Sequence, residues 1–324
     1  MNNENSIGQK VSGVFKNKIG ILIALIALIA FFAFLPSTSN VFLTSNNVLN
    51  ILRQASTNLY VALAMTMVII LGGIDLSVGS IIALSGVITG GLVAYNGFPV
   101  YVGVIGGLVV GLVFGAFNGL VISKTTIPAF IVTLATMNIG RGLAYIYTGG
   151  APIRIVSDEF NFIGAGYIGS IPTPVIYLIV LIIVAMYIMN RSKMGRHIYA
   201  VGGNPQAAKF SGISNAKVVF FVHVFSGLMA AISGVVLASR MFSGQPTAGE
   251  GAEMDAIAAV VVGGTSMSGG RGTIGGTIIG GLIIAVLNNG LNLMNVNSFW
   301  QLVVKGVVIL VAVYVDYIRN RKGK

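Results

Sequence analysis

Residues that could carry chemistry are scarce in this chain. Its 324 residues include eight acids, two histidines and no cysteine. His197 and His223 lie far apart in the sequence without a carboxylate nearby, a spacing that does not predict a metal site. The sequence contains no GxxxxGK(S/T) loop of the kind that cradles nucleotide phosphates, and no readable Ser/His/Asp arrangement. These observations predict neither an enzyme nor a bound metal or cofactor.

Three charged residues lie within or beside apolar segments and are stronger candidates for function: Asp75, Arg141 and Lys305. A charged side chain at the centre of a bilayer costs about 3 kcal/mol unless it is paired or hydrated, so such residues often mark functional sites. Asp75 follows two glycines, and either Asp75 or Ser77 could cap a helix that begins there. A role in a gate or pathway is the alternative for Asp75. Arg141 and Lys305 either extend to the end of a span or line a pathway.

Amide side chains extend this set, because amides are among the few polar groups that orient ligands in binding pockets. Six amides lie in or near apolar segments: Asn118, Asn138, Asn288, Asn289, Asn292 and Gln301. Together with Ser77 and the three charged residues, we expect them to line a substrate pathway or gate.

The elements that must position these residues are helices that span a membrane. Hydrophobic residues make up 55% of the chain and charged residues 8%, and the mean hydropathy is +0.92. Soluble domains are about 25% charged. The apolar residues form long blocks, near the ~20 residues that cross a bilayer as a helix, without the alternation of a membrane β-barrel. The sequence therefore predicts an all-α polytopic membrane protein with about ten spans: 19–35, 55–71, 78–94, 100–122, 128–147, 174–189, 218–239, 254–263, 274–291 and 299–317.

Two segments fit this pattern less simply. The apolar part of the span at 254–263 is short, so a re-entrant half-helix is one interpretation. We favour a short helix that crosses and is shielded from lipid by its neighbours, because this keeps the basic C-terminus inside. Residues 47–58 have apolar side chains on one helical face, which predicts a separate short helix in the membrane interface.

Glycines and an internal similarity suggest how the spans pack. Glycine recurs at every fourth position from Gly103 to Gly115, which favours close contact with another helix. An apolar run followed by paired glycines and small polar residues occurs at 68–80 and again at 260–268. This similarity suggests duplicated halves around a central path.

The distribution of positive charge predicts the orientation. The formal net charge is +11, but the basic residues lie between apolar blocks, which indicates membrane topology and no binding of nucleic acid. With the N-terminus inside, fourteen of the nineteen lysines and arginines fall in inside segments, and only Arg53, Arg154 and Arg240 fall outside. We therefore expect both termini on the cytoplasmic side of the cell membrane.

These expectations divide the chain into three parts. Residues 1–18 are a cytoplasmic tail, residues 19–317 the transmembrane domain and residues 318–324 a basic cytoplasmic tail. The longest inside loop spans residues 190–217.

This loop is more than a linker. Asn204 followed by proline is a helix-start signal, Gln206 to Ser211 a short helix and Gly212 its stop. A short helix on the cytoplasmic face is a suitable surface for a soluble partner. A surface helix without a partner is the alternative.

Several motifs carry a resemblance to a known family. QAAKFSG at 206–212 resembles the EAA-type coupling loop of ABC importer permeases, with glutamine in place of the usual glutamate. Longer motifs are similar to those of the ribose-type permeases: GGIDLSVGS at 72–80, QPTAG at 245–249, DAIAA at 255–259, GGTS at 263–266 and LNNGLNL at 287–293. The resemblance covers about residues 40 to 316, nearly the whole chain.

The resemblance implies a membrane subunit like those of type II ABC importers. Such a subunit dimerises with a second copy of itself in the membrane lipid, binds a cytoplasmic ABC ATPase subunit and receives a monosaccharide, here ribose, from an extracytoplasmic binding protein. The implied ATPase-coupling residues are Arg196, Asn204, Gln206, Ala207, Ala208, Ser211 and Gly212. Arg53, Arg154 and Arg240 are the candidate docking residues for the binding protein. An ion- or proton-coupled secondary transporter of a small polar solute is the alternative function.

Overall fold

The structure, a computed structural model, describes residues 4–321, with side-chain burial for residues 19–318. The ends of the two predicted tails, residues 1–3 and 322–324, lie outside the described residues. The chain is almost entirely helical: α1 (Glu4–Phe34), α2 (Ser39–Phe42), α3 (Ser45–Ile70), α4 (Val78–Ala94), α5 (Val100–Lys124), α6 (Ala129–Thr148), α7 (Asp158–Ala165), α8 (Thr173–Arg191), α9 (Lys193–Gly203), α10 (Pro205–Phe210), α11 (Asn215–Arg240), α12 (Ala252–Val262), α13 (Ile274–Leu293) and α14 (Ser298–Arg321). Two antiparallel pairs of strands join β1 (Ile153–Arg154) to β4 (Ser243–Gly244) and β2 (Tyr167–Ile168) to β3 (Ile171–Pro172).

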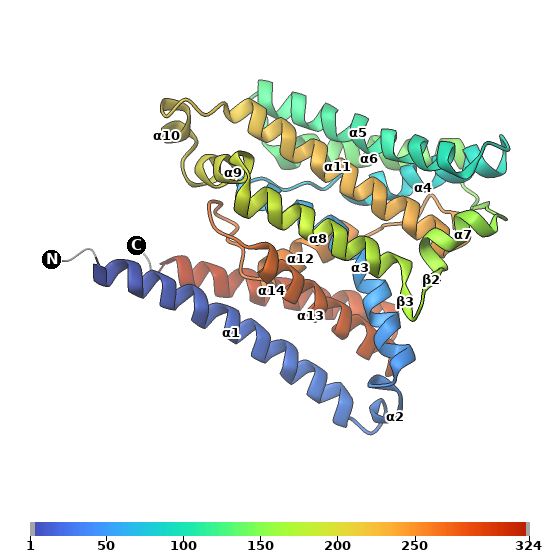
Figure 1. The fold of residues 1–324 in the computed structure, drawn as a ribbon, viewed down its shortest axis with the longest axis horizontal. Coiled ribbons are helices and arrows are strands. Elements are labelled where there is room, and N and C mark those ends of the chain that lie inside the picture. Colours follow the sequence, from blue (N-terminus) through green and yellow to red (C-terminus); the bar gives the residue numbers. More distant parts are fainter. Residues whose placement is uncertain (1–3, 322–324) are drawn as a thin grey trace.

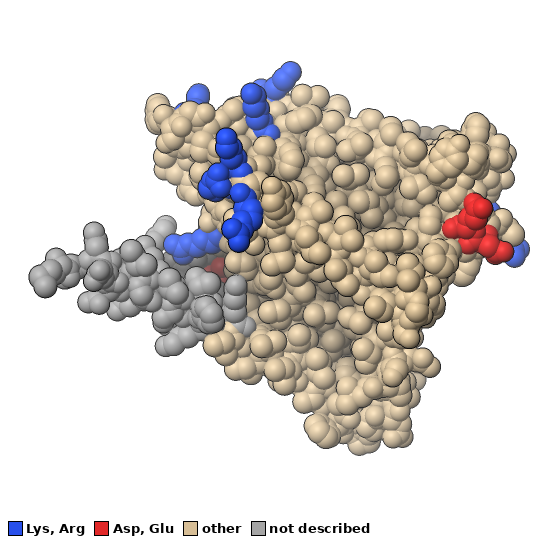
Figure 2. All heavy atoms as spheres, in the orientation of Figure 1, with Lys and Arg blue, Asp and Glu red and all other residues tan. Residues whose placement is uncertain are grey.

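The long helices run between two ends of the molecule (Figure 1). The start of α1, the end of α14, and α9 and α10 lie at one end; α2, α7 and the β2–β3 pair lie at the other. Figure 2 shows lysine and arginine side chains gathered at the first end, which we call the basic end. Its exposed basic residues include Arg191, Lys193, Arg196, Lys209 and Lys217. The charge asymmetry between the loops is thus also an asymmetry between the two ends of the structure.

α3 is the central helix. Its residues 59–70 are at most 1% exposed, and α3 packs against α8, α11, α12 and α13. The surrounding helices direct apolar side chains outward; Ile146 of α6 is 79% exposed and Leu310 of α14 70%. An apolar outer surface around a tightly packed interior is what a lipid environment requires.

Six helices in the part of the chain that the structure describes are long and apolar enough to cross a membrane: α5, α6, α8, α11, α13 and residues Ser298–Ile318 of α14. Two apolar segments are shorter, Ile19–Phe34 and Val78–Ala94. Each span predicted from the sequence coincides with a helix of the structure.

The contact between α5 and α11 depends on glycine. The glycines from Gly103 to Gly115 that recur at every fourth position of α5 are all buried. A Cβ atom on Gly111 would overlap the carbonyl oxygen of Gly227 in α11, and a Cβ atom on Gly227 would overlap that of Gly111. The two backbones therefore touch directly, as small residues at membrane helix interfaces allow.

α3 ends in a Schellman motif. The Gly72 N–H donates to Ile69 O (2.9 Å), and the Gly73 N–H donates to Val68 O (3.0 Å). Gly72 has φ 81°, the left-handed conformation that this motif requires. The irregular segment 71–77, which we call the first break, follows and leads to α4.

α12 ends with the same hydrogen-bond pattern. The Gly264 N–H donates to Val261 O (2.9 Å), and the Thr265 N–H donates to Val260 O (3.1 Å). Gly264 has φ 84°, nearly the value of Gly72. The segment 263–273, the second break, leads to α13. The internal similarity seen in the sequence is thus a repeated helix–break–helix unit.

The prediction of a separate interfacial helix at 47–58 is wrong. Thr44 accepts a hydrogen bond from the Asn47 N–H as the N-cap of α3, and one continuous helix follows from Ser45. On the apolar face of that segment, Ile51 and Ala55 are buried in the bundle, whereas Val48 is 38% exposed. Part of this face therefore packs against protein, where the sequence suggested membrane.

Gly227→Ala tests the backbone contact between α5 and α11. The added methyl group meets a carbonyl oxygen that cannot rotate away, so we expect a loss of stability of about 1–3 kcal/mol. The measurement is the thermal unfolding midpoint of the purified protein. Gly142→Ala in α6, where a Cβ atom meets open space, is the control and should leave the midpoint unchanged or slightly higher. Equal midpoints for both variants would contradict the packing described.

Candidate functional site

A polar cavity of about 440 Å³ lies where α3, α11, α12, α13 and α14 meet, toward the end opposite the basic end. Its polar lining consists of Gln54, Thr57, Asn58, Arg240, Glu250, Asp255, Asn288, Asn292, Gln301 and Lys305. This lining brings together the predicted pathway residues Asn288, Asn292, Gln301 and Lys305, and the predicted docking residue Arg240. A concave site with several amides and both signs of charge can hold a small polar solute by hydrogen bonds.

Lys305 is held by an ion pair at the wall of this cavity. Its Nζ lies 3.0 Å from Asp255 Oδ2, and the two side chains are 24% and 13% exposed. The pair joins α14 to α12 and compensates two charges that are mostly withdrawn from solvent. The structure therefore gives Lys305 a partner that was not recognised in the sequence.

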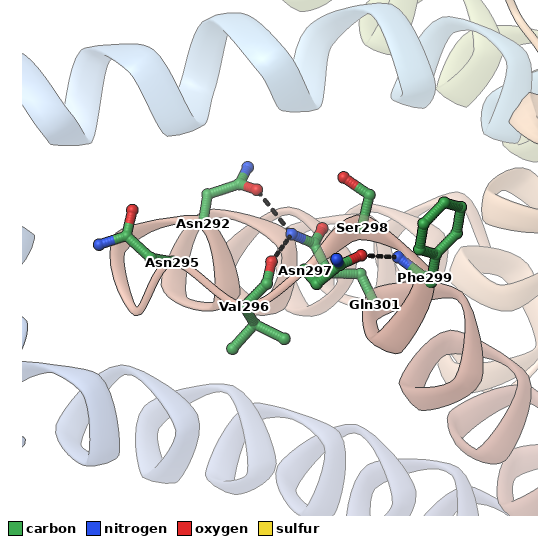
Figure 3. A pocket seen from close by; sticks show the side chains of 7 residues that line it. All are labelled: Asn292, Asn295, Val296, Asn297, Ser298, Phe299 and Gln301. Carbon is green, nitrogen blue, oxygen red and sulfur yellow. Dashed lines mark hydrogen bonds between the residues drawn. The ribbon is translucent and has the colours of Figure 1, made fainter.

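A second, open pocket of about 520 Å³ lies at the turn between α13 and α14 (Figure 3). Asn292 and Gln301 line both this pocket and the polar cavity. Gln301 Nε2 donates to Asn292 Oδ1 and to Val296 O, both at 2.9 Å. These bonds fix the start of α14 relative to the end of α13, so the two pockets share one ordered wall.

Asp75 lies in the first break and is 1% exposed. Its Oδ1 accepts hydrogen bonds from the Ser77 N–H (3.0 Å) and hydroxyl (2.6 Å), and its Oδ2 accepts one from the Ser226 hydroxyl (2.7 Å). Asn118 Nδ2 donates in turn to Ser77 Oγ at 2.9 Å. Asp75, Ser77 and Asn118 thus form one buried network that ties the first break to α5 and α11, and they do not line the polar cavity.

The side-chain cap expected at the start of α4 is not formed. Ser77 occupies the N-cap position, but its side chain makes no capping hydrogen bond; its hydroxyl donates to Asp75 and accepts from Asn118. Asp75 instead fixes the turn before the helix. Its carboxylate is satisfied by three donors, which stabilise a buried charge more strongly than neutral hydrogen bonds would.

Arg141 holds a loop in place. Its Nη1 donates to Pro246 O (2.5 Å) and to Ala248 O (2.8 Å), which fastens the segment after β4 to α6. Glu250, close to the end of that segment in the sequence, lines the polar cavity. Arg141 therefore holds the segment that leads to the cavity wall. The sequence had left two alternatives for Arg141: lining a pathway, or extending to the end of a span.

Besides Asn118, two further amides of the predicted set lie away from the cavity lining. Asn289 exchanges two hydrogen bonds with Asn47, at 3.0 and 2.9 Å, and so joins α13 to α3. Asn138 is exposed on α6 and donates to Leu134 O of its own helix at 3.1 Å. The sequence did not separate these amides from those of the cavity, because all of them lie near apolar segments.

The three arginines predicted to be outside have different environments. The Arg53 guanidinium lies over the Tyr167 ring, 4.7 Å from its centroid, and its Nε and Nη2 are buried with no hydrogen-bond partner among the described residues. Arg240 lines the polar cavity. Arg154 is exposed in β1. A buried guanidinium with free donors is able to receive a carboxylate.

The short helix predicted in the loop 190–217 is confirmed. Asn204 Oδ1 accepts a hydrogen bond from the Ala207 N–H (3.0 Å) as the N-cap of α10, and Pro205 begins the helix. Gly212 follows its end with φ 81°. α9, which carries the exposed Arg196, precedes it and was not predicted.

The surface of α10 differs from the one expected. Gln206, Ala207 and Ser211 are exposed, but Ala208 is 4% exposed and packs within the chain. Phe210 was not singled out from the sequence, although it is 89% exposed. A large aromatic side chain on a surface that also carries charge is typical of a protein–protein contact.

A bundle of apolar helices that encloses a polar cavity toward one end and presents short helices at a basic opposite end is the architecture of a membrane permease. The chain belongs to the family described as the branched-chain amino acid transport system / permease component, whose family model matches residues 47–313.

Three relatives show how close the similarity is. The chain is 48% identical to the ribose import permease protein RbsC of Bacillus subtilis, over 85% of this chain and 86% of that protein. It is 45% identical to the ribose import permease protein RbsC of Haemophilus influenzae, over 87% and 88%. It is 39% identical to the D-allose transport system permease protein AlsC of Escherichia coli strain K12, over 94% and 92%. No solved structure matches the chain.

The chain is therefore a multi-pass protein of the inner membrane that supplies a translocation path and is not an enzyme. In an importer of this kind, a separate ATPase subunit hydrolyses ATP and a binding protein delivers the solute.

A double-mutant cycle tests the pair between Lys305 and Asp255. Lys305→Met leaves the Asp255 carboxylate unpaired at the cavity wall. We therefore expect Lys305→Met to destabilise the native chain more than it destabilises the Asp255→Asn variant. The coupling should be about 1 kcal/mol or more. Thermal unfolding of the four proteins gives this value, with Lys124→Met as an exposed control. Strictly additive effects would contradict the pair.

Proposed function

We propose that this chain is the permease subunit of an ABC importer that carries ribose, delivered by an extracytoplasmic binding protein and driven by a separate ATPase. The polar cavity carries the proposal, since its volume of about 440 Å³ and its amide lining suit a small solute with many hydroxyl groups. Ribose is favoured among the monosaccharides because the identity to a ribose relative, 48%, exceeds that to the D-allose relative, 39%.

The secondary transporter is less well supported. A proton- or ion-coupled carrier needs a carboxylate that exchanges its ligand during the cycle. Asp75 is tied to three donors and Asp255 is paired with Lys305. Both carboxylates are therefore already committed to interactions that hold helices together.

We infer that the basic end faces the cytoplasm, with both termini on that side. Exposed lysines and arginines gather there, as the positive-inside rule requires. In this orientation the polar cavity lies toward the outside, and α10 lies inside. Ten helices would cross: α1, α3, α4, α5, α6, α8, α11, α12, α13 and α14. α12 is short, but residues 256–261 are buried by neighbours that include α3, α13 and α14.

The binding protein would dock on the outer end. Arg53, Arg154 and Arg240 offer guanidinium groups there, and acidic side chains of the binding protein are the complementary partners. Because Arg240 also lines the polar cavity, docking and delivery of the solute would occur at the same place. The assembly would contain a second copy of the chain, in keeping with the resemblance to type II importers.

The ATPase would dock on α10. Arg196, Gln206, Ala207 and Ser211 are exposed at this end, and Asn204 and Gly212 fix the two ends of the helix. Phe210 supplies the large apolar side chain that anchors such contacts. Ala208 holds α10 against the chain and does not face the partner.

Uptake into proteoliposomes tests the function. The purified chain, its ATPase and a ribose-loaded binding protein should accumulate labelled ribose when ATP is enclosed, and ionophores that collapse ion gradients should leave the rate unchanged. Vesicles without the ATPase subunit are the control. Uptake that needs an ion gradient and no ATP would establish the secondary transporter instead, and uptake of another monosaccharide alone would overturn the choice of ribose.

Phe210→Ala tests the ATPase contact. Loss of a central aromatic anchor typically costs about 2 kcal/mol or more, so we expect binding of the ATPase to weaken more than tenfold while membrane insertion is unchanged. Phe162→Ala at the opposite end, where the side chain is 49% exposed, is the matched control. Titration of the ATPase onto the purified variants gives both affinities, and equal values would refute the contact.

A further inference from the structure

Residues 266–272 of the second break, which we call the connecting loop, contact three helices: α3, α14 and α9. The Gly270 N–H donates to the carbonyl oxygen of Ile70, the last residue of α3, at 2.8 Å. The Met267 N–H donates to Asp316 Oδ2 in α14 at 3.3 Å. The connecting loop therefore touches the basic-end termini of two helices whose other ends line the polar cavity.

The same loop is fastened to α9, next to the proposed ATPase contact. The Tyr199 hydroxyl donates to Gly272 O at 2.9 Å. Burial raises the pKa of Tyr199 above its ordinary value, so this hydroxyl keeps its proton and remains a donor.

Glycines bring the backbones of these segments into direct contact. A Cβ atom on Gly202 of α9 would overlap the Ile70 carbonyl oxygen, whereas one on the adjacent Gly203 would meet no atom within 4 Å. Gly269 and Gly270 of the connecting loop have φ 82° and 70°; Gly269 packs on Gly202 and Ile70, and Gly270 packs on Gly202 and Gly203. No flexible side chain separates α9 from the end of α3.

We propose that the connecting loop transmits movement of α9 and α10 to α3 and α14, with Tyr199 and Gly202 as positioning residues. The inference rests on the proposed function, because the movement would come from the ATPase. Contacts between backbones cannot absorb a displacement by changing rotamers, so α9 cannot shift without shifting Ile70 and Gly270. α14 would carry the shift to Lys305 and Gln301 at the cavity wall.

The test compares adjacent glycines in the complete transporter with its ATPase and binding protein. Because the chain has no cysteine, Gln301→Cys provides a single label site at the cavity wall. ATP should change the labelling rate by an impermeant thiol reagent in the Gln301→Cys parent and equally with Gly203→Ala. With Gly202→Ala, we expect the change to be at least fivefold smaller while the ATPase stays bound. A full change with Gly202→Ala would overturn the proposal, as would a parent whose labelling ATP does not alter.

Tyr199→Phe keeps the test decisive if Gly202→Ala fails to assemble. This variant removes one hydroxyl and leaves the packing, so we expect the ATP-dependent change to fall at least twofold with the ATPase still bound. Tyr187→Phe, on the exposed face of α8, is the control. An unchanged response of Tyr199→Phe would overturn the proposal. The labelling needs no sugar, so failure of the parent to accumulate ribose would contradict only the proposed substrate.

Discussion

Within the hydrocarbon of a bilayer, an interrupted helix leaves N–H and C=O groups that water cannot satisfy, so interruptions persist only where protein satisfies them. The two breaks of this permease follow helices that end toward the basic end, and protein groups satisfy much of their backbone. Each begins with a Schellman motif, and the second break supplies the Gly270 N–H that binds the end of α3. The Thr133 hydroxyl donates to Ile74 O at 3.2 Å, and the Asp75 network closes the remainder of the first break. The Gly270 bond therefore holds the second break against the end of α3.

The same constraint relates the two ends of the molecule. At the basic end α9 rests on the second break, while amides and charges line the polar cavity toward the other end. Between them, residues 59–70 of α3 are buried, and α14 presents an apolar outer face. A chain built in this way needs no nucleotide site of its own. A separate ATPase subunit can act on the breaks from the basic end, and a solute can enter from the opposite end.

Local patterns predicted the helices well, and contacts between distant segments could not be predicted. The apolar block at 78–94 gave the bounds of α4, and Asn204, Pro205 and Gly212 gave those of α10 to within one residue, because these signals act within a few residues. The pair between Asp255 and Lys305 has no such signal. For residues 47–58, the apolar face was assigned to the membrane interface, but Ile51 and Ala55 of that face are buried in the bundle, since amphipathicity alone does not identify the apolar partner. The exposure of Phe210 and the burial of Ala208 depend likewise on how α10 packs in three dimensions.

In the proposed topology α12 crosses the membrane, so the segment before it, beside the polar cavity, and the second break after it face opposite sides. Thr247 and Ser268 flank α12 and are exposed. Thr247→Cys and Ser268→Cys, made singly in this cysteine-free chain, can be labelled with an impermeant thiol reagent in intact cells and in inverted membrane vesicles. We expect labelling of Thr247→Cys from outside only and of Ser268→Cys from the cytoplasmic side only. Labelling of both from the same side would contradict this topology.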